Sequence, residues 1–449
     1  MPIADGGGQI YSGDYHDHLV TDWFQPIIVD ARNNSAVLWS LMPSTSENIA
    51  GKFVTYPVRK GRNEGISAVG HRGKLADPGS QSADQHTFMT RTVFARVLID
   101  GETYDDARKD AAAYVDLVTF ELEGLIDDII QEQNRMLHSD GSGRLCEVVS
   151  VASLTVTVEI NQDIEGAATC DTAPTRWIRP GMKLAFMQPD GTSLTHATVL
   201  TVPSDTTFTV DAFTAGSGGN TAIATGDWVC RTAGINTSYA LKDCAYRNEP
   251  MGWEGILSDA NIADGNGLAV GQTGADGDTT AGGVGFQGLD ATASGNEYNQ
   301  AVVRSNAGVK RAITEDILQD AIWEAERRNN ADVKLLLSNG GPYNDYLKTL
   351  VKDKRFNNTQ DLAGGHKSLD FNGVPWIKDR NAYDNRVKGM DIDQARIYEK
   401  VPLSYVDWNG QKWKRLEDDE DYQLAMKYRC TVGVDCRQRT GFHLVDLQN

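Results

Sequence analysis

One amphipathic segment of about 35 residues sets the length scale of any fold that this chain can adopt. Between Thr103 and His138, apolar side chains recur every three or four residues, the spacing of one face of an α-helix. The stripe consists of Ala107, Ala111, Val115, Val118, Leu122, Leu125, Ile129 and Met136. Thr103 is the expected N-cap, and the turn-forming sequence Ser139–Gly143 ends the helix. At about 1.5 Å per residue, such a helix is roughly 50 Å long, which suits an extended subunit.

A long polar connection precedes this helix. The segments Lys52–Val58 and His86–Ile99 alternate apolar and polar side chains, as strands do. The stretch Arg59–His86 is about 28 residues long and has almost no apolar content, whereas ordinary hairpin loops take about 2–5 residues. Connections of this length are usually functional or mobile. We therefore predict a projecting arm at this point of the chain.

The first half of this stretch is basic, in a chain whose formal net charge is -19. Its cations are Arg59, Lys60, Arg62, Arg72 and Lys74. No aromatic residue is interleaved with them for base stacking, which disfavours binding of single-stranded nucleic acid. Because the chain is acidic elsewhere, another copy of it offers complementary charge. We therefore predict that these five residues contact a neighbouring subunit, and a solvated loop without a partner stays open as the alternative.

Residues 146–232 differ in character from the rest of the chain. They contain short Thr/Val-rich alternating runs separated by Pro-Gly, Asp-Gly and Gly-rich turns, a pattern typical of a small antiparallel barrel or sandwich. An α/β pattern resumes near Gly234, so we interpret the β-rich part as an inserted domain. The α/β part contains a Gly-rich region, Asp264–Gly295, and a strong helix for which Thr314 is the expected cap.

No catalytic or metal-binding motif stands out. The sequence has no G-x-S-x-G motif, and Ala363–Ser368 fails as a phosphate-binding loop because His366 replaces a required glycine. His16 and His18 form an H-x-H pair without a third ligand, and Asp259–Gly267 has its acidic positions out of register for a calcium loop. The six cysteines include no C-x-x-C pair and are expected to be reduced structural thiols. We expect no enzyme activity, metal or cofactor.

Five phrases are similar to the major capsid proteins of tailed bacteriophages, the family with the HK97-like fold. They are VFARVLIDGETYDDA (Val93–Ala107), RMLHSDGSGRL (Arg135–Leu145), FQGLDATASGNEYNQAVV (Phe286–Val303), LDFNGVPWIKDRNA (Leu369–Ala382) and MDIDQARIYE (Met390–Glu399). The order of elements also resembles that family: an arm, two strands around a long loop, a long helix, and an α/β region that returns to C-terminal strands. The resemblance covers most of the chain outside residues 146–232.

The resemblance implies an α+β, HK97-like capsid fold with an N-terminal arm, an E-loop, a peripheral (P) domain built on a spine helix, and an axial (A) domain, plus the inserted all-β barrel or sandwich domain. The expected segments are residues 1–48 for the arm, 49–100 for the E-loop with its flanking strands, 101–145 for the spine helix and the first part of the P domain, 146–232 for the inserted domain, 233–390 mainly for the A domain, and 391–449 for the return strands of the P domain and the C-terminus.

The resemblance also implies a structural role without enzyme activity, in the virion capsid after assembly in the host cytoplasm. Copies would form the hexamers and pentamers of an icosahedral shell that encloses packaged double-stranded DNA. Expected partners are other copies of the chain, a separate scaffolding protein, a portal and decoration proteins. Contact with DNA would be weak and nonspecific, and no membrane is expected, because no stretch approaches 18 apolar residues.

Two alternatives stay open. One is the shell of an encapsulin-like compartment with the same fold, which would enclose cargo enzymes. The other is a carbohydrate-binding or carbohydrate-processing protein with a β-module, which would require a cleft with paired carboxylates.

Overall fold

A computed structural model describes the chain with short gaps. The described residues are 37–99, 101, 111–160, 173–189, 191, 194–216, 222–235, 237–259, 285–329, 331–352, 359–361, 367–408, 410–415 and 421–448. The chain divides into two compact units. The first unit comprises Met1–Ser40, Thr92–Asn134 and Lys400–Cys430, and the second comprises Leu41–Arg91, Arg135–Glu399 and Thr431–Asn449.

The first unit contains most of the long helix α5 (Ala111–His138). The helix ends at His138, as predicted, whereas the predicted N-cap Thr103 lies outside the described residues. Leu122, Ile126 and Ile129 are at most 3% exposed, so one face of α5 is buried at the expected helical spacing. Strong apolar periodicity over a long segment is the most reliable signal in a sequence, and here it located the helix.

One sheet has five strands. The order is β1–β19–β21–β20, and β5 also pairs with β21. The strands are β1 (Ser44–Thr45), β5 (Arg91–Ile99), β19 (Ala395–Tyr405), β20 (Trp413–Arg415) and β21 (Tyr422–Val434). The prediction of one strand over His86–Ile99 is wrong in one respect, because the strand is interrupted at Thr90. The backbone N–H of Thr90 donates to the carbonyl of Lys52 at 2.9 Å, and a new strand begins at the next residue.

A short helix, α3 (Val37–Leu41), lies in the described part of the segment expected to be an extended arm. Leu38 is fully buried and Trp39 is 7% exposed. Trp39 packs edge-on against Tyr428, with ring centroids 5.4 Å apart. These contacts show that the end of the segment has a packed core that its mixed sequence did not indicate. Residues 1–36 lie outside the described part of the chain.

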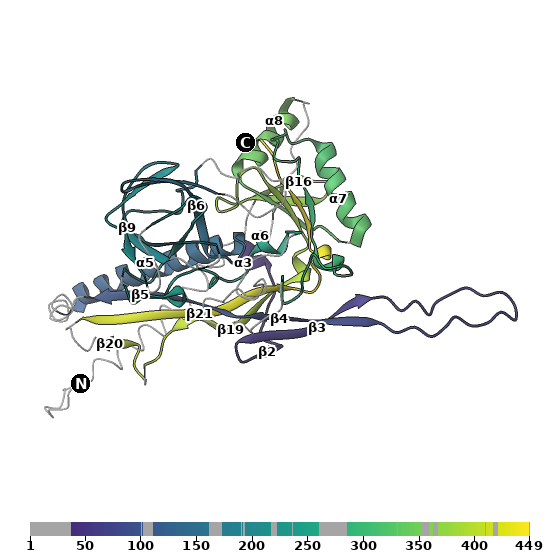
Figure 1. Cartoon of the computed structure of the whole chain (residues 1–449), viewed down its shortest axis with the longest axis horizontal. Coiled ribbons are helices and arrows are strands. Elements are labelled where there is room, and N and C mark those ends of the chain that lie inside the picture. The colour runs from purple at the N-terminus through teal and green to yellow at the C-terminus, as the bar shows by residue number, and fades with distance from the viewer. Residues whose placement is uncertain are drawn as a thin grey trace. The chain divides into compact units, whose positions relative to one another are not determined.

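In the second unit, seven strands between residues 144 and 231 form one antiparallel sheet (teal in Figure 1). The strands are β6 (Arg144–Ala152), β7 (Thr155–Glu159), β8 (Lys183–Met187), β9 (Leu194–Ser204), β10 (Thr207–Val210), β11 (Thr214–Ala215) and β12 (Trp228–Arg231). Because β10 pairs with both β7 and β9, six of the strands close into a barrel. Alternate residues of β7 and β10 are buried, which accounts for the Thr/Val alternation of the sequence.

A second seven-stranded sheet in this unit is mixed, in the order β13–β22–β18–β14–β17–β16–β15. The strands are β13 (Val302–Arg304), β14 (Leu335–Ser338), β15 (Thr359–Asp361), β16 (Lys367–Phe371), β17 (Val374–Lys378), β18 (Val387–Met390) and β22 (Gly441–Leu444). Helices α7 (Glu315–Asn329) and α8 (Gly340–Lys352) share a core with this sheet. The Oγ1 atom of Thr314 accepts a hydrogen bond from the N–H of Ile317 at 3.3 Å, which confirms the predicted cap.

A buried ionic cluster joins α6 (Trp253–Ile256) to the second sheet. The carboxylate of Glu254 pairs with Arg386 and lies 2.6 Å from Nζ of Lys388, and all three side chains are at most 3% exposed. Burial alone would raise the pKa of Glu254, but the two cations outweigh it and hold the pKa well below its usual value.

Taken with the sheets and helices above, the architecture is α+β, as predicted, with helices packed on strand-rich cores.

Candidate assembly surfaces

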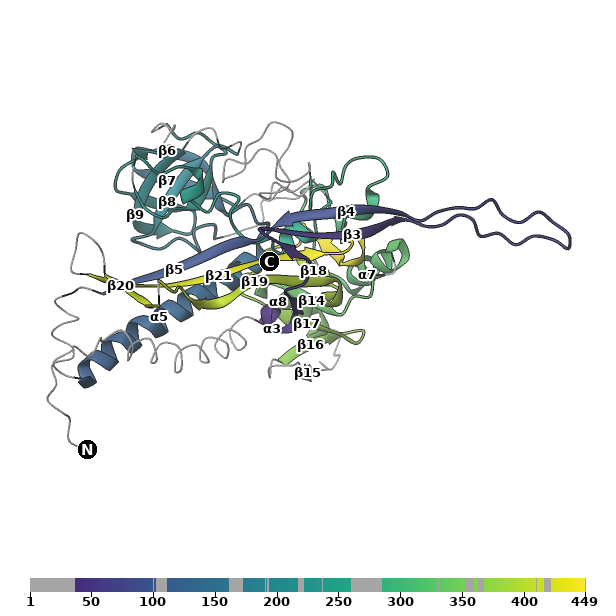
Figure 2. The ribbon, with the colours of Figure 1, turned by 90° about the horizontal axis from the view of Figure 1, so that it is seen from below.

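The arm predicted from the polar stretch is a β-hairpin. Strands β3 (Phe53–Gly61) and β4 (Ser82–Met89) pair antiparallel, from Phe53 opposite Met89 to Gly61 opposite Ser82. The hairpin extends far beyond the sheets of its own unit, as both views show (Figures 1 and 2). The connection between the strands, residues 62–81, forms its distal part. The prediction of two strands around a long loop is therefore confirmed, but the loop is shorter than predicted, because Arg59–Gly61 and Ser82–His86 belong to the paired strands.

The base of the hairpin, here called the root, is fixed by an aromatic cluster. Tyr56 stacks on Tyr398 with ring centroids 5.8 Å apart, and its hydroxyl donates to the carbonyl of Val434 at 2.9 Å. Phe88 packs edge-on against both tyrosine rings. A Cβ atom on Gly433 would lie 2.3 Å from Phe88, so only glycine lets the backbone of β21 approach this cluster. The root is thus closely packed, in contrast to the exposed distal part.

Polar contacts hold the same root. Nζ of Lys60 donates to Oδ1 of Asn296 at 2.9 Å and lies 3.1 Å from Oδ2 of Asp84. The hydroxyl of Tyr298 donates to the same carboxylate at 2.9 Å. Burial alone would raise the pKa of Asp84, but the hydrogen bonds from Lys60 and Tyr298 lower it below its usual value. The carboxylate therefore stays ionised as a link between the two strands and the segment Asn296–Tyr298.

The five cations predicted to contact a neighbour lie at two places on the hairpin. Arg59 and Lys60 belong to the end of β3, and Arg62 directly follows that strand. Arg72 and Lys74 lie in the distal part. All five residues are exposed, but the structure does not bring them together into one patch.

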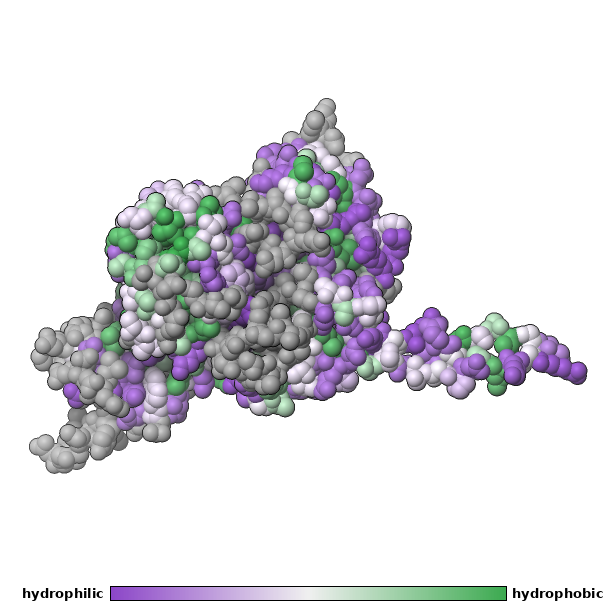
Figure 3. Space-filling model, viewed as in Figure 1, coloured by the Kyte–Doolittle hydropathy of each residue, from purple (hydrophilic) through white to green (hydrophobic). Residues whose placement is uncertain are grey.

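The distal part of the hairpin also carries apolar side chains whose importance the sequence analysis missed. Ile66 is 70% exposed, Val69 is 47% exposed and Leu75 is 86% exposed. Figure 3 shows apolar side chains in green among polar ones on the projecting hairpin. They are only three residues in a polar stretch, so they did not form a periodic pattern. The sequence signal that could have identified them as contact residues was their position on a segment already predicted to project.

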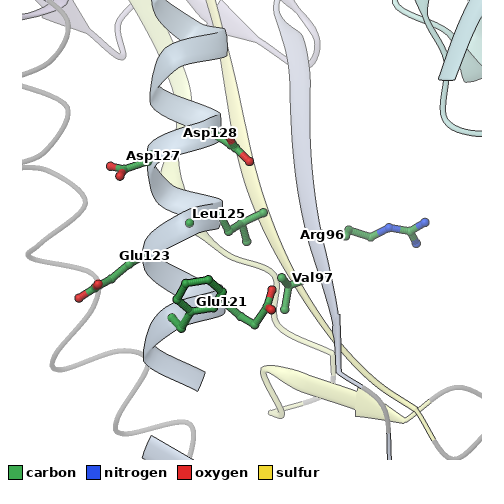
Figure 4. A pocket seen from close by; sticks show the side chains of 9 residues that line it. Arg96, Val97, Glu121, Glu123, Leu125, Asp127 and Asp128 are labelled. Atoms are coloured by element: carbon green, nitrogen blue, oxygen red, sulfur yellow. The ribbon is translucent and has the colours of Figure 1, made fainter. Parts of the chain in front are cut away.

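A second exposed surface lies in the first unit, between α5 and β5. It includes a pocket of about 490 Å³ whose lining contains Val97, Phe120 and Leu125 together with the acidic residues Glu121, Glu123, Asp127 and Asp128. In Figure 4, Val97, Glu121 and Leu125 lie between the helix and the strand. Arg96 points away from α5. Phe120 is 75% exposed, so the surface combines an uncovered aromatic ring with negative charge. We call it the α5–β5 surface.

Strand β5 also exposes apolar side chains on its other face, which points away from α5. Phe94 is 62% exposed and Leu98 is 56% exposed, and both lie on the face of the strand that also carries Arg96, because side chains alternate along a strand. Large apolar side chains left in water at several neighbouring positions mark an interaction surface more often than isolated ones do.

The described residues offer neither a metal cluster nor a disulfide. No group of three His, Cys, Asp or Glu side chains there could hold a metal ion. His16, His18 and residues 260–267, which the sequence analysis considered as ligands, lie outside the described part. Cys146, Cys230, Cys244, Cys430 and Cys436 are free thiols, and Cys170 is not among the described residues. Over the described helices, none combines the length and the apolarity needed to cross a membrane.

Comparison with known proteins gave matches only at the level of structure. No family model matches the sequence, and no curated protein matches it. The fold is similar to that of a chain from the capsid asymmetric unit of cyanophage A-1(L), with a TM-score of 0.50, 10% sequence identity, and coverage of 92% of this chain and 93% of that chain. Weaker likenesses include the capsid of a native GTA particle (TM-score 0.40, 10% identity, 92% and 89% coverage) and Gordonia phage Cozz (TM-score 0.40, 12% identity, 92% and 86% coverage). The cyanophage comparison, which spans nearly the whole of both chains, shows that this chain has the fold of a bacteriophage capsid protein, as the sequence resemblance predicted.

Proposed function

We propose that the chain is a structural major capsid protein, whose copies form the hexamers and pentamers of an icosahedral shell around packaged double-stranded DNA. The observation that carries this proposal is the hairpin itself. Its residues 66–75 are all exposed, although they include Ile66, Val69 and Leu75. A projecting segment of this kind is suited to bind a neighbouring subunit. The shared fold with a cyanophage capsid protein supports the same conclusion.

The energetics favour a partner for the hairpin. Fully burying an aliphatic side chain of this size contributes about 1.5–3 kcal/mol relative to leaving it in water. Ile66 and Leu75 are each at least 70% exposed, so most of that free energy is available only through association. Repeated over many identical subunits, contacts of this size can hold a closed shell together through interfaces alone.

The α5–β5 surface of a second copy is the receptor that we propose for the hairpin. The hairpin offers Arg72 and Lys74 beside apolar side chains, and the surface offers Glu123 and Asp127 beside the exposed ring of Phe120. Charges of opposite sign therefore flank apolar groups on both sides. Such complementarity fixes the register of a contact and disfavours wrong partners.

We also propose the remaining assignments that the resemblance implies. The barrel would be an accessory domain inserted after the spine helix. The proposed segments are 1–48 for the arm, 49–100 for the E-loop, 101–145 for the spine helix, 146–232 for the inserted domain, 233–390 mainly for the A domain and 391–449 for the return strands and C-terminus. The partners would be a separate scaffolding protein, a portal and decoration proteins. Assembly would take place in the host cytoplasm, and the mature protein would be located in the virion capsid without enzyme activity.

Deletion of Gly61–Ala83 tests the role of the hairpin. The deletion joins Lys60 directly to Asp84. Val58 already pairs with Asp84 in the hairpin, so Arg59 and Lys60 can form a two-residue turn that closes the remaining strands. We expect a folded subunit with a cooperative unfolding transition but few or no shells by sedimentation and negative-stain microscopy. A matched variant that replaces only Ser80 with Ala should assemble normally. Stable shells of normal size from the deletion variant would contradict the proposed role.

A further inference from the structure

A pocket of about 760 Å³ lies at the root of the hairpin, within the second unit. Its walls come from the end of β3, from the last turn of α7, and from three short 3-10 helices, η3 (Glu297–Asn299), η4 (Ile392–Gln394) and η5 (Arg437–Arg439). We call it the root pocket. Its volume falls in the range of about 300–1,000 Å³ that is typical of small-molecule sites.

The lining of the root pocket is basic, in contrast to the acidic chain as a whole. It contains the cations Arg59, Lys60, Arg327, Arg328 and Arg439, against the carboxylates of Glu326 and Asp435. A concentration of positive charge in a concave site raises the local concentration of anions. The pocket therefore favours an anionic occupant.

Two of these cations are already paired within the subunit. Lys60 lies 3.1 Å from Asp84, and Arg328 lies 2.7 Å from Glu324. The other three are the arginines Arg59, Arg327 and Arg439. Within the described residues, no carboxylate forms an ion pair with any of these three. They come from three different elements, all of which line this pocket.

The walls that carry these arginines are firmly held. Arg437, which is fully buried, donates through Nε to the carbonyl of Ile256 at 3.1 Å and through Nη1 to the carbonyl of Asn299 at 3.1 Å. Its guanidinium also lies 4.1 Å from the ring centroid of Phe286. These contacts fix η5 and hence the backbone of Arg439. On α7, Glu324 is bound at 2.8 Å by Arg304 from β13.

We propose that the root pocket binds a phosphate-bearing anion, either a free oligophosphate or the backbone phosphates of a nucleic acid. A phosphate group carries nearly two charges and three acceptor oxygens, so it can accept from several arginines at once, whereas a carboxylate has only two oxygens. The planar guanidinium fork matches phosphate oxygens in pairs. The pocket is large enough for more than one phosphate group. This binding site is independent of the proposed shell function.

Occupancy of the pocket would link the hairpin to the second sheet. An anion bound by Arg59 on β3, Arg327 on α7 and Arg439 on η5 would connect three elements that line this cavity. Binding would then restrict movement of the hairpin about its root. The ligand would hold the hairpin in place and would not be a substrate.

Titration of the purified full-length chain with pyrophosphate at low salt tests the proposal. We expect one site per chain by calorimetry. Arg327→Glu and Arg439→Glu should each weaken binding at least about tenfold, because each removes a charge-assisted hydrogen bond and adds repulsion. Arg380→Glu is the matched control, since Arg380 is exposed in the same unit and does not line the pocket. Absence of binding, or equal binding by all three variants, would overturn the proposal.

A second measurement needs no variant. Pyrophosphate should slow amide hydrogen exchange at residues 57–60 and 326–328 of the native chain, and unchanged exchange at both segments would count against the site. A short DNA duplex that displaces pyrophosphate identifies nucleic-acid phosphates as the source, and a duplex that does not displace it identifies a free oligophosphate. Both results support the site. A polyglutamate peptide that displaces pyrophosphate at a lower concentration than either phosphate ligand would overturn the phosphate assignment.

Discussion

Nζ of Lys60 lies 3.1 Å from Oδ2 of Asp84, so the last cation of β3 is neutralised by the opposite strand of its own hairpin. Lys74, in the distal part, is exposed and has no such partner in the described part of the chain. The five cations that the sequence analysis grouped together therefore have two environments. Those of the distal part remain available to a neighbouring subunit, whereas Lys60 already stabilises the root.

Lys60→Met should loosen the root of the hairpin without abolishing assembly. The pair with Asp84 is partly exposed, so its loss should lower the free energy of unfolding by only about 0.5–1 kcal/mol. Amide hydrogen exchange in β3 and β4 should become faster. Lys74→Met is the matched control and should leave stability unchanged while it reduces assembly. If Lys74→Met lowered stability and Lys60→Met instead reduced assembly, the two lysines would not have these separate roles.

Charge reversal should show whether the hairpin binds the α5–β5 surface. Arg72→Glu with Lys74→Glu should strongly reduce the fraction of protein in shells, because glutamates would then face Glu123 and Asp127 of the neighbour. Adding Glu123→Lys and Asp127→Lys should restore assembly in part. Sedimentation measures that fraction. If the quadruple variant assembles no better than the double variant, the hairpin does not dock at this surface.

The apolar residues of the distal part should contribute to assembly without contributing to folding. Ile66→Ser and Leu75→Ser each remove a side chain that is at least 70% exposed in the subunit, so unfolding of the unassembled chain should be unchanged. Each variant should raise the protein concentration needed for assembly, since burial of such a side chain contributes about 1.5–3 kcal/mol. Light scattering against concentration measures this shift. A loss of subunit stability would show that the residues have a different role.

Two glycine-to-alanine changes should have opposite effects on stability. In Gly433→Ala the new methyl group would lie 2.3 Å from Phe88, and the repacking of the root should lower the free energy of unfolding by about 1–3 kcal/mol. In Gly124→Ala nothing lies within 4 Å of the new Cβ, and α5 should gain about 1 kcal/mol in helix propensity. Urea denaturation measures both. Equal effects of the two changes would contradict the described packing of the root.

Buried histidines should make stability fall in mild acid. Burial lowers the pKa of His443 to about 3 from its usual 6.5, although Glu254 opposes the shift. Between these pH values the unfolded chain binds a proton that the folded chain does not, so the free energy of unfolding should fall by about 1.4 kcal/mol per unit as pH drops. His86 and His196, whose pKa values burial also lowers, act in the same direction.

His443→Gln should reduce the slope of the free energy of unfolding against pH by the contribution of one proton, about 1.4 kcal/mol per pH unit. Ser80→Ala, an exposed change that removes no titratable group, is the control and should leave the slope unchanged. Urea denaturation of the unassembled chain at several pH values between 4.5 and 6.5 measures the slope. An identical slope for the native chain and His443→Gln would mean that His443 is not kept neutral by burial.

Features encoded by neighbouring residues were predictable from the sequence. The end of α5 at His138, the cap at Thr314 and the strands on both sides of the polar stretch each rest on a signal within a few residues. The contacts that fix the hairpin do not. Tyr56 bonds to Val434, which is 378 residues away, and no local pattern encodes that meeting. No local pattern encodes the position of β22 either: this last strand of the described residues inserts between β13 and β18.

The candidate surfaces were predicted only in part. The exposed cations of the hairpin could be identified because they stand out in an acidic chain. The α5–β5 surface could not, since Glu123 and Asp127 look like the solvated face of any amphipathic helix until the neighbouring strand is placed. The root pocket was equally hidden, because Arg327 and Arg439 are far apart in sequence and meet only in the fold.

Electron microscopy of the purified full-length chain, expressed alone and with a co-expressed scaffolding protein, is the sharpest test of the proposed shell. We expect rings of five and six subunits and closed shells of uniform diameter. Uniform monomers at high protein concentration under both conditions, with no rings and no shells, would contradict it.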